Sequence, residues 1–208
     1  MNERLPTGID VLDRTLSGGI PAGSIVALVA APASQSELLL YELTVPRETL
    51  YLTTERSAEA VRDAFERTDA PAGTPDIEQV TGEAPLDGAG RLVETLPRKS
   101  TLIVDPVDPL ERCEPARYRR FMNALQTAMV NTGSVAVLHC LSGCSTPSGR
   151  DRTEYMADVV FSLETRVAGE SIENRLAVPK FRGGRALSET IKLELGDRVR
   201  VDTSRDIA

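Results

Sequence analysis

Apolar segments recur between polar ones over the first two thirds of the chain and predict the strands of a sheet. They cover residues 25–30, 49–53, 77–80, 101–105 and 134–140. The first of these is a continuous apolar run, which is typical of a strand buried on both faces of a sheet, and the last reads as another buried strand.

Helical spacing appears in the segments between these predicted strands. Residues 58–65 and 116–130 carry apolar positions on one face, as Phe121, Leu125 and Met129 do in the longer segment. We also predict a short helix at 91–96, a short N-terminal helix capped by Thr7 or Asp10, and a helix that begins near Ser34 or Ser36 and runs to residue 43.

The pattern changes after residue 158, where four strand-like segments follow one another without helices. They lie at residues 159–163, 175–180, 190–195 and 198–201, with hairpin turns at Gly169-Glu170 and Gly196-Asp197. Alternating strands and helices imply right-handed βαβ units and a parallel sheet. The fold class is therefore α/β, with a mostly parallel central sheet flanked by helices and a C-terminal antiparallel β-meander, in a single domain over 1–208.

The charge balance narrows the possible partners. The net charge is −7 at pH 7, which argues against binding nucleic acid through a broad basic face. The acidic excess suits a high-salt cytoplasm, and an ordinary, mildly acidic bacterial or archaeal protein fits equally well. No apolar run approaches the roughly 20 residues that span a bilayer, and the N-terminus lacks the features of a signal peptide. We expect a cytoplasmic protein without membrane association.

The three cysteines do not form a recognisable metal motif. Cys113, Cys140 and Cys144 are odd in number and are expected to be reduced thiols in the cytoplasm. His139 precedes Cys140, but a tetrahedral zinc site needs a fourth ligand, and the chain has neither a second histidine nor a C-x-x-C pair. We expect no metal site from these residues.

The segment at residues 26–41 reads as an apolar strand, a short loop and a helix, which is the layout of a phosphate-binding loop. The pattern G-x-x-x-x-G-K-[ST] falls on residues 31–38, A-P-A-S-Q-S-E-L. Ala31 and Ser36 stand at the glycine positions, Glu37 at the lysine and Leu38 at the metal-binding hydroxyl. The architecture of a phosphate loop is present, and the residues that hold phosphate are replaced.

Several motifs together resemble the RecA/KaiC-like ATPases, and KaiC-type domains most closely. The lead-in T-G-I-x-x-L-D at residues 7–13 and L-x-G-G-I-P-x-G-S at 16–24 is similar to that family's approach to its phosphate loop. L-Y-L-T-T-E at 50–55, L-I-V-D at 102–105, A-D-V-V at 157–160 and K-F-R-G at 180–183 resemble its later strands. The similarity runs from about residue 5 to residue 202 and implies a RecA-like three-layer fold.

The resemblance also implies roles for individual residues. Glu55 takes the place of the catalytic base and Asp105 that of the Walker B carboxylate, which holds Mg²⁺. His139 ends the next strand, where a polar sensor of the γ-phosphate lies. Lys180 and Arg182 correspond to a basic pair that reaches a neighbouring subunit's phosphates. A purely structural interpretation of each residue stays open: inherited strand-end carboxylates, a structural histidine and solvated strand charges.

The departures at the loop weaken nucleotide binding. At about 4 Å, two like charges repel by roughly 4 kcal/mol at an effective dielectric near 20, so a carboxylate at Glu37 opposes a polyphosphate. Ser34-Gln35-Ser36-Glu37 also matches the capping box S-x-x-E, in which Ser34 and Glu37 would close the helix end. The pattern therefore favours a phosphate loop that has lost its function and holds no cofactor. If the pocket still works, the ligands it would hold are ATP and Mg²⁺.

Three functions follow from these observations. The first is a non-catalytic regulatory or assembly protein, a pseudo-ATPase that forms homo-oligomers or docks on an active KaiC-like paralogue and supplies Lys180 and Arg182. The second is a weak ATPase that binds nucleotide through Glu55, Asp105 and neighbouring subunits. The third is a recombinase-like DNA-binding accessory that uses Arg150 and Arg152 in the polar loop at 141–152. Because the chain is acidic, DNA binding is the function that the sequence supports least.

Overall fold

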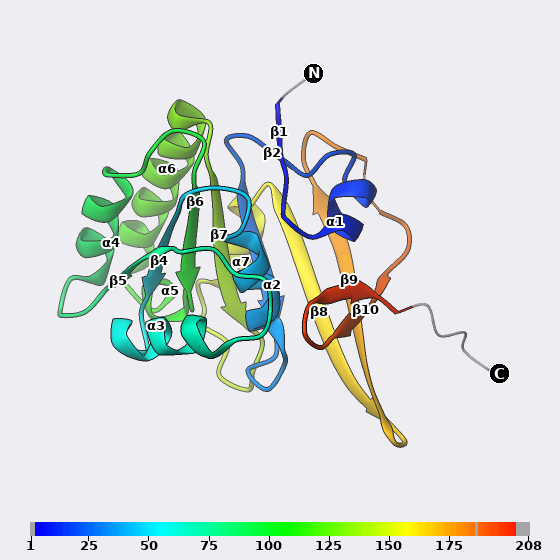
Figure 1. Ribbon diagram of the computed structural model, residues 1–208. Helices are drawn as coiled ribbons and strands as arrows, with labels where there is room; N and C mark the ends of the chain where they lie inside the picture. The colour runs from blue at the N-terminus through cyan, green and yellow to red at the C-terminus, as the bar shows by residue number, and fades with distance from the viewer. Residues whose placement is uncertain (1–2, 186, 203–208) are drawn as a thin grey trace.

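One twisted sheet runs through the molecule (Figure 1). In the computed structural model, which describes residues 3–185 and 187–202, nine strands form this sheet in the order β11–β10–β9–β8–β3–β7–β6–β4–β5. The strands from β8 to β5 in that order are parallel to one another. Their bounds are β3 Ile25–Ala30, β4 Thr49–Thr53, β5 Asp76–Gln79, β6 Thr101–Asp105, β7 Val135–Leu141 and β8 Val159–Ala168.

Antiparallel strands complete one side of the sheet. They are β9 Ser171–Phe181, β10 Ile191–Leu195 and β11 Val199–Val201, each paired with the strand before it in the chain. The β8–β9 hairpin turns at Gly169 and Glu170, as predicted, and its far end projects beyond the helices (Figure 1). Near the N-terminus, β1 Arg4–Leu5 and β2 Ile20–Pro21 form a separate two-stranded sheet. The predicted β-meander is confirmed.

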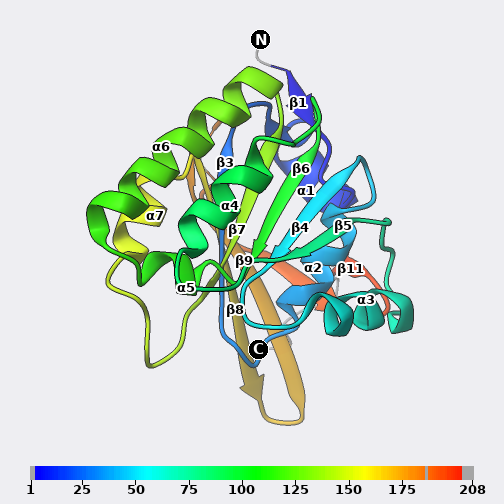
Figure 2. The same ribbon diagram turned by 90° about the vertical axis from the view of Figure 1, so that its left-hand side faces the viewer.

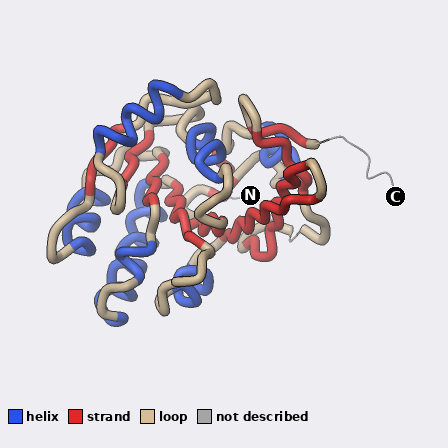
Figure 3. Tube along the Cα trace, turned by 90° about the horizontal axis from the view of Figure 1, so that it is seen from below, coloured by secondary structure: helices blue, strands red, loops and turns tan. Residues whose placement is uncertain are grey.

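Helices cover both faces of the parallel part of the sheet (Figures 2 and 3). On one face lie α1 Asp10–Thr15, α2 Ser36–Leu43 and α3 Ala58–Arg67. On the other lie α4 Pro85–Val93, α5 Asp108–Glu111, α6 Pro115–Thr132 and α7 Arg150–Met156. The three-layer α/β architecture expected from the sequence is therefore present.

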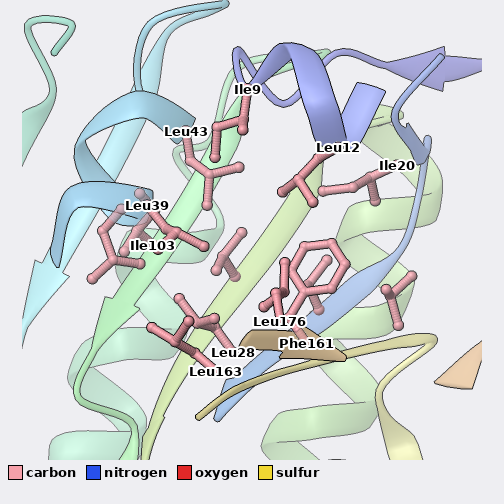
Figure 4. Packing of buried hydrophobic residues seen from close by; sticks show 14 of the residues in the cluster. Ile9, Leu12, Ile20, Leu28, Leu39, Leu43, Ile103, Phe161, Leu163 and Leu176 are labelled. Atoms are coloured by element: carbon pink, nitrogen blue, oxygen red, sulfur yellow. The ribbon is translucent and has the colours of Figure 1, made fainter. Parts of the chain in front are cut away.

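Two apolar clusters, one on each face of the sheet, form the core. Leu12 of α1 and Leu39 of α2 pack with Leu28 and Phe161 of the sheet in the first cluster (Figure 4). In the second, Tyr118, Met122 and Leu125 of α6 pack against the sheet's other face. The continuous apolar strands are buried on both sides, which explains why their sequences lack alternation.

Some boundaries differ from the sequence prediction. The helix expected at residues 91–96 begins at Pro85, since a proline is well tolerated in the first turn of a helix. The polar loop predicted at 141–152 is interrupted by α7, whose first residue, Arg150, is buried by partners far away in the sequence. Among the described residues, no helix has the length and apolar character needed to cross a membrane.

Candidate functional site

The carboxyl ends of four parallel strands meet at one edge of the sheet and bring several of the predicted site residues together. The loop that contains Ser34 follows β3, Arg56 follows β4, Asp105 ends β6 and His139 lies near the end of β7. Strands β3, β7, β6 and β4 are neighbours in that order. In open α/β sheets this edge is where ligands bind.

The loop between β3 and α2 is held by its own serines. The Ser34 hydroxyl lies 2.7 Å from the carbonyl oxygen of Ala31 and 3.1 Å from Ser36 Oγ. Helix α2 begins at Ser36, and its N-cap residue, Gln35, makes no side-chain capping bond. The predicted capping box is therefore wrong, because Ser34 bonds within the loop and Glu37 turns to other partners.

Glu37 forms an ion pair where the phosphate-loop pattern calls for a cation. Its Oε1 lies 2.8 Å from the Arg56 guanidinium, and the Tyr41 hydroxyl donates to its Oε2 at 3.3 Å. Burial and the neighbouring Glu37 raise the pKa of Tyr41 to about 12, so this hydroxyl keeps its proton. The charge of Glu37 is thus neutralised within the chain.

Arg56 extends this pairing to the strand-end carboxylate. Its Nη2 lies 3.0 Å from Asp105 Oδ2, while its Nη1 contacts Glu37. Burial acts to lower the pKa of Arg56, but the charges of Glu37 and Asp105 outweigh it and raise that pKa. The guanidinium therefore remains a cation held between two carboxylates.

Asp105 is the centre of the network. Besides Arg56, it accepts hydrogen bonds from the Tyr51 hydroxyl at 2.5 Å and from His139 Nδ1 at 2.6 Å. Burial acts to raise the pKa of this carboxyl, but the bonds from His139 and Tyr51 and the charge of Arg56 lower it to about 2. Asp105 is therefore ionised and fully partnered at neutral pH.

His139 connects Asp105 back to the loop. An ionised carboxylate can only accept, so His139 Nδ1 donates to Asp105, and its Nε2 lies 3.1 Å from Ser36 Oγ. The serine, histidine and aspartate have the order of a nucleophile, base and orienting carboxylate. Ser36 is only 3% exposed, however, and Asp105 is shared with two further donors. The arrangement holds the loop to the sheet.

We call these seven residues the Asp105 network: Ser36, Glu37, Tyr41, Tyr51, Arg56, Asp105 and His139. Among the described residues, no buried side-chain nitrogen or oxygen lacks a hydrogen-bond partner. The network thus satisfies itself with groups of this chain alone.

The predicted catalytic base, Glu55, lies outside the Asp105 network. Its side chain is exposed, and among the described residues it forms no ion pair. Its neighbour Arg56 turns inward instead. Sequence reasoning identified Asp105 and His139 but missed Arg56 and Tyr51. The available signal was a cation next to Glu55 and a tyrosine inside an otherwise aliphatic strand.

Lys180 and Arg182 bind main-chain carbonyls of α7 rather than standing free. Lys180 Nζ donates to the carbonyls of Glu154 and Tyr155, both at 2.7 Å. Arg182 donates to the carbonyls of Tyr155 and Met156 at 2.8 and 3.2 Å. Cations at a helix C-terminus satisfy its last carbonyls and complement its dipole. In this chain the pair anchors the end of α7.

The two arginines proposed for nucleic-acid contact are also engaged. Arg150 is 4% exposed and forms ion pairs with Glu111 at 2.9 Å and Asp108 at 3.0 Å. Arg152 donates to the carbonyl of Pro115 at 3.3 Å. Within the described part of the chain, no group of three or more His, Cys, Asp or Glu side chains is arranged to hold a metal ion.

Comparisons with known proteins agree with the fold. The KaiC-like protein PH0186 from the hyperthermophilic archaeon Pyrococcus horikoshii OT3 superposes with a TM-score of 0.77 at 17% identity, over 96% of this chain and 100% of that one. The chain therefore has the RecA/KaiC-like fold, as the sequence motifs imply.

Sequence relatives include the DNA repair protein RadA of Mycolicibacterium smegmatis, which is 31% identical over 177 residues. RadA of Mycobacterium tuberculosis is 31% identical over 176 residues. Each match covers 76% of this chain but only 37% and 35% of the relatives, so the chain spans little more than a third of their length. A family model matches residues 4–208, and the chain belongs to that family, DUF7125, a family of unknown function.

Proposed function

We propose that this chain is a non-catalytic RecA/KaiC-like protein, a pseudo-ATPase that acts in regulation or assembly through protein–protein contacts. The observation that carries the proposal is the Asp105 network. The side chains that would meet phosphate and metal are paired with one another, through Glu37, Arg56 and Asp105.

The loop supplies nothing that holds a polyphosphate. A phosphate loop needs glycines so that its N–H groups can wrap the phosphates, and a lysine that reaches them. Residues 30–43 contain no glycine, lysine or arginine. A shift of the motif by one residue, which matches the start of α2, places Ser36 at the lysine position and Glu37 at the hydroxyl. The conclusion is the same in either register.

Arg56 is the cation in this network that could contact a phosphate, but its charge is already balanced by Glu37 and Asp105. To receive a phosphate it would have to leave Glu37 and Asp105, and both carboxylates would then face the incoming anion. Asp105 is equally committed, because a Mg²⁺ ion would compete with Tyr51, His139 and Arg56 for its two oxygens. Nucleotide binding therefore requires dismantling a satisfied network.

The contribution of Lys180 and Arg182 to a partner's site remains part of the proposal, with a condition. Both side chains must release the carbonyls of α7 before they reach a neighbouring subunit. We expect a Lys180→Ala/Arg182→Ala variant to lose its effect on an active RecA/KaiC-like partner while keeping its overall fold. Circular dichroism verifies the fold, and partner hydrolysis measured with and without the variant tests the role.

ATP hydrolysis tests the proposal itself. We expect the chain alone to hydrolyse ATP no faster than its Asp105→Asn variant, and to change the hydrolysis rate of an active RecA/KaiC-like partner when the two are mixed. Magnesium-dependent hydrolysis by the chain alone that Asp105→Asn abolishes would favour the competing function, an unorthodox ATPase.

A second candidate is a DNA-binding accessory, which the similarity to DNA repair proteins named RadA favours. The structure of the loop gives it little support, because Arg150 is buried against Glu111. Filter binding of single-stranded DNA at several salt concentrations decides the point, since phosphate contacts make affinity fall steeply with salt. We expect no retention at physiological salt.

A further inference from the structure

The end of α2 that is away from the loop borders a hollow in the surface. An open hollow of about 490 Å³ is formed there by residues of α1, α2 and β11. Strand β11 contacts both helices, and α1 lies on the same side of the molecule as the C-terminal strands (Figure 1). Small-molecule sites have volumes of about 300–1,000 Å³, so the hollow is large enough to hold a ligand.

Three arginines line this hollow. Arg14 lies in the last turn of α1, and Arg198 and Arg200 flank Val199 at the start of β11. Among the described residues, Arg14 and Arg198 form no ion pair, whereas Arg200 lies 3.0 Å from Asp197. In a chain with a net charge of −7, unpaired guanidiniums in a concave surface create local attraction for anions.

Two carboxyl groups complete the lining. Glu42 is 4% exposed, and its Oε1 accepts a hydrogen bond from the main-chain N–H of Val199 at 2.6 Å. Burial raises the pKa of this carboxyl. Asp10 is exposed at the first residue of α1. The hollow therefore presents cations and hydrogen-bonding carboxyl groups side by side.

Gly8 lines the hollow at the point where the chain passes close to the end of α2. Its φ of +83° is in the left-handed region, and a Cβ there would lie 2.7 Å from the Glu42 carbonyl oxygen. The close approach of the chain to α2 at this wall therefore requires glycine.

We propose that this hollow binds a phosphorylated sugar or another phosphorylated polyol. A guanidinium group can donate two parallel hydrogen bonds to the oxygens of a phosphate, a role that Arg14, Arg198 and Arg200 could fill. Carboxyl groups accept hydrogen bonds from hydroxyls, which suits Asp10 and Glu42. Inorganic phosphate would use only the first set, and a free sugar only the second. The proposal is independent of the state of the Asp105 network.

Calorimetric titration with ribose 5-phosphate tests the proposal, with inorganic phosphate and ribose as comparison ligands at low salt. We expect ribose 5-phosphate to bind about tenfold more tightly than either comparison ligand, a difference of about 1.4 kcal/mol. An Arg14→Ala/Arg198→Ala variant should weaken its binding by at least about tenfold. Asp10→Asn should weaken ribose 5-phosphate binding but not phosphate binding.

A matched variant, Arg119→Ala/Arg120→Ala, removes the same charge from the exposed face of α6 and should leave the affinity within about twofold. The absence of ribose 5-phosphate binding, equal binding of inorganic phosphate, or equal binding by the Arg14→Ala/Arg198→Ala variant would each overturn the proposal. An Arg56→Ala variant separates the two sites. Binding that only this variant abolishes would place the ligand at the Asp105 network and contradict the hollow.

Discussion

The charged side chains at the two ends of α2 differ in whether they form ion pairs. At its first turn, Glu37 pairs with Arg56, which pairs in turn with Asp105. At its last turn, Glu42 lines a hollow in which Arg14 and Arg198 form no ion pair within the described residues, and the charge of Arg198 acts on the Glu42 carboxyl. One helix of eight residues thus joins a region whose charges are satisfied to one whose charges are available.

This difference shows that the position of a group in a known fold does not by itself indicate whether the group is free to bind a ligand. The edge of the sheet where α/β proteins bind ligands is the end at which this chain has closed its polar groups onto one another. Burial alone would mark that edge as a site, because Asp105 and His139 are 5% and 4% exposed. The pairing of each group within the chain supports the proposal that these residues hold the loop in place.

The largest effect is expected at the closed end. Replacing Asp105 with alanine leaves the Tyr51 hydroxyl and His139 Nδ1 buried without an acceptor, and Arg56 with only one of its two carboxylates. We expect a loss of about 3 kcal/mol in the free energy of unfolding, measured by urea denaturation.

Asp151→Ala is the matched control, because this carboxylate is exposed in the first turn of α7. It should change stability by less than about 1 kcal/mol. If the two variants lost equal stability, the Asp105 network would not hold the loop to the sheet as described above.

Acid sensitivity is the next effect in size. The folded pKa of Asp105, about 2, lies below the value of about 3.9 for an unfolded chain. A carboxyl whose pKa is lower in the folded state stabilises that state at every pH above its pKa in the unfolded chain. This stabilisation is lost as the pH falls from about 4 to 2. We expect a loss of about 2 kcal/mol from this group. Urea titrations at several pH values should show a shallower acid dependence in Asp105→Asn, and identical slopes would rule out this assignment.

The smallest effect on stability is expected at the open end of α2. Arg14 and Arg198 are exposed and unpaired within the described residues, so the Arg14→Ala/Arg198→Ala variant should unfold within about 0.5 kcal/mol of the parent. Thermal and urea denaturation measure this directly. A large loss would mean that these arginines support β11 against α1, and the contrast between the two ends would disappear.

Much of the fold can be predicted from sequence because burial leaves a local pattern. The apolar runs at β3 and β7 and the spacing of Phe121, Leu125 and Met129 in α6 place these elements correctly. The local sequence pattern does not predict α7, because its burial depends on residues that are far away in the sequence. Its first residue, Arg150, is polar in the sequence but is buried by Glu111, which lies 39 residues away.

The site was predictable only in part for the same physical reason. Strand ends identify Asp105 and His139, because parallel strands bring their carboxyl ends to one edge. The inward turn of Arg56 depends on Asp105, 49 residues later, and on Glu37 in the loop. The capping box matched by Ser34 and Glu37 is a local pattern, and the ion pair with Arg56 overrides it.

Calorimetric titration of the chain with ATP and Mg²⁺ tests the central claim most directly. A closed Asp105 network predicts no binding tighter than about 100 μM, which corresponds to about 5.5 kcal/mol. The Arg14→Ala/Arg198→Ala variant should be included, so that any phosphate binding in the hollow is assigned to its own site. Binding tighter than this limit that persists in that variant and is lost in Asp105→Asn would contradict the account.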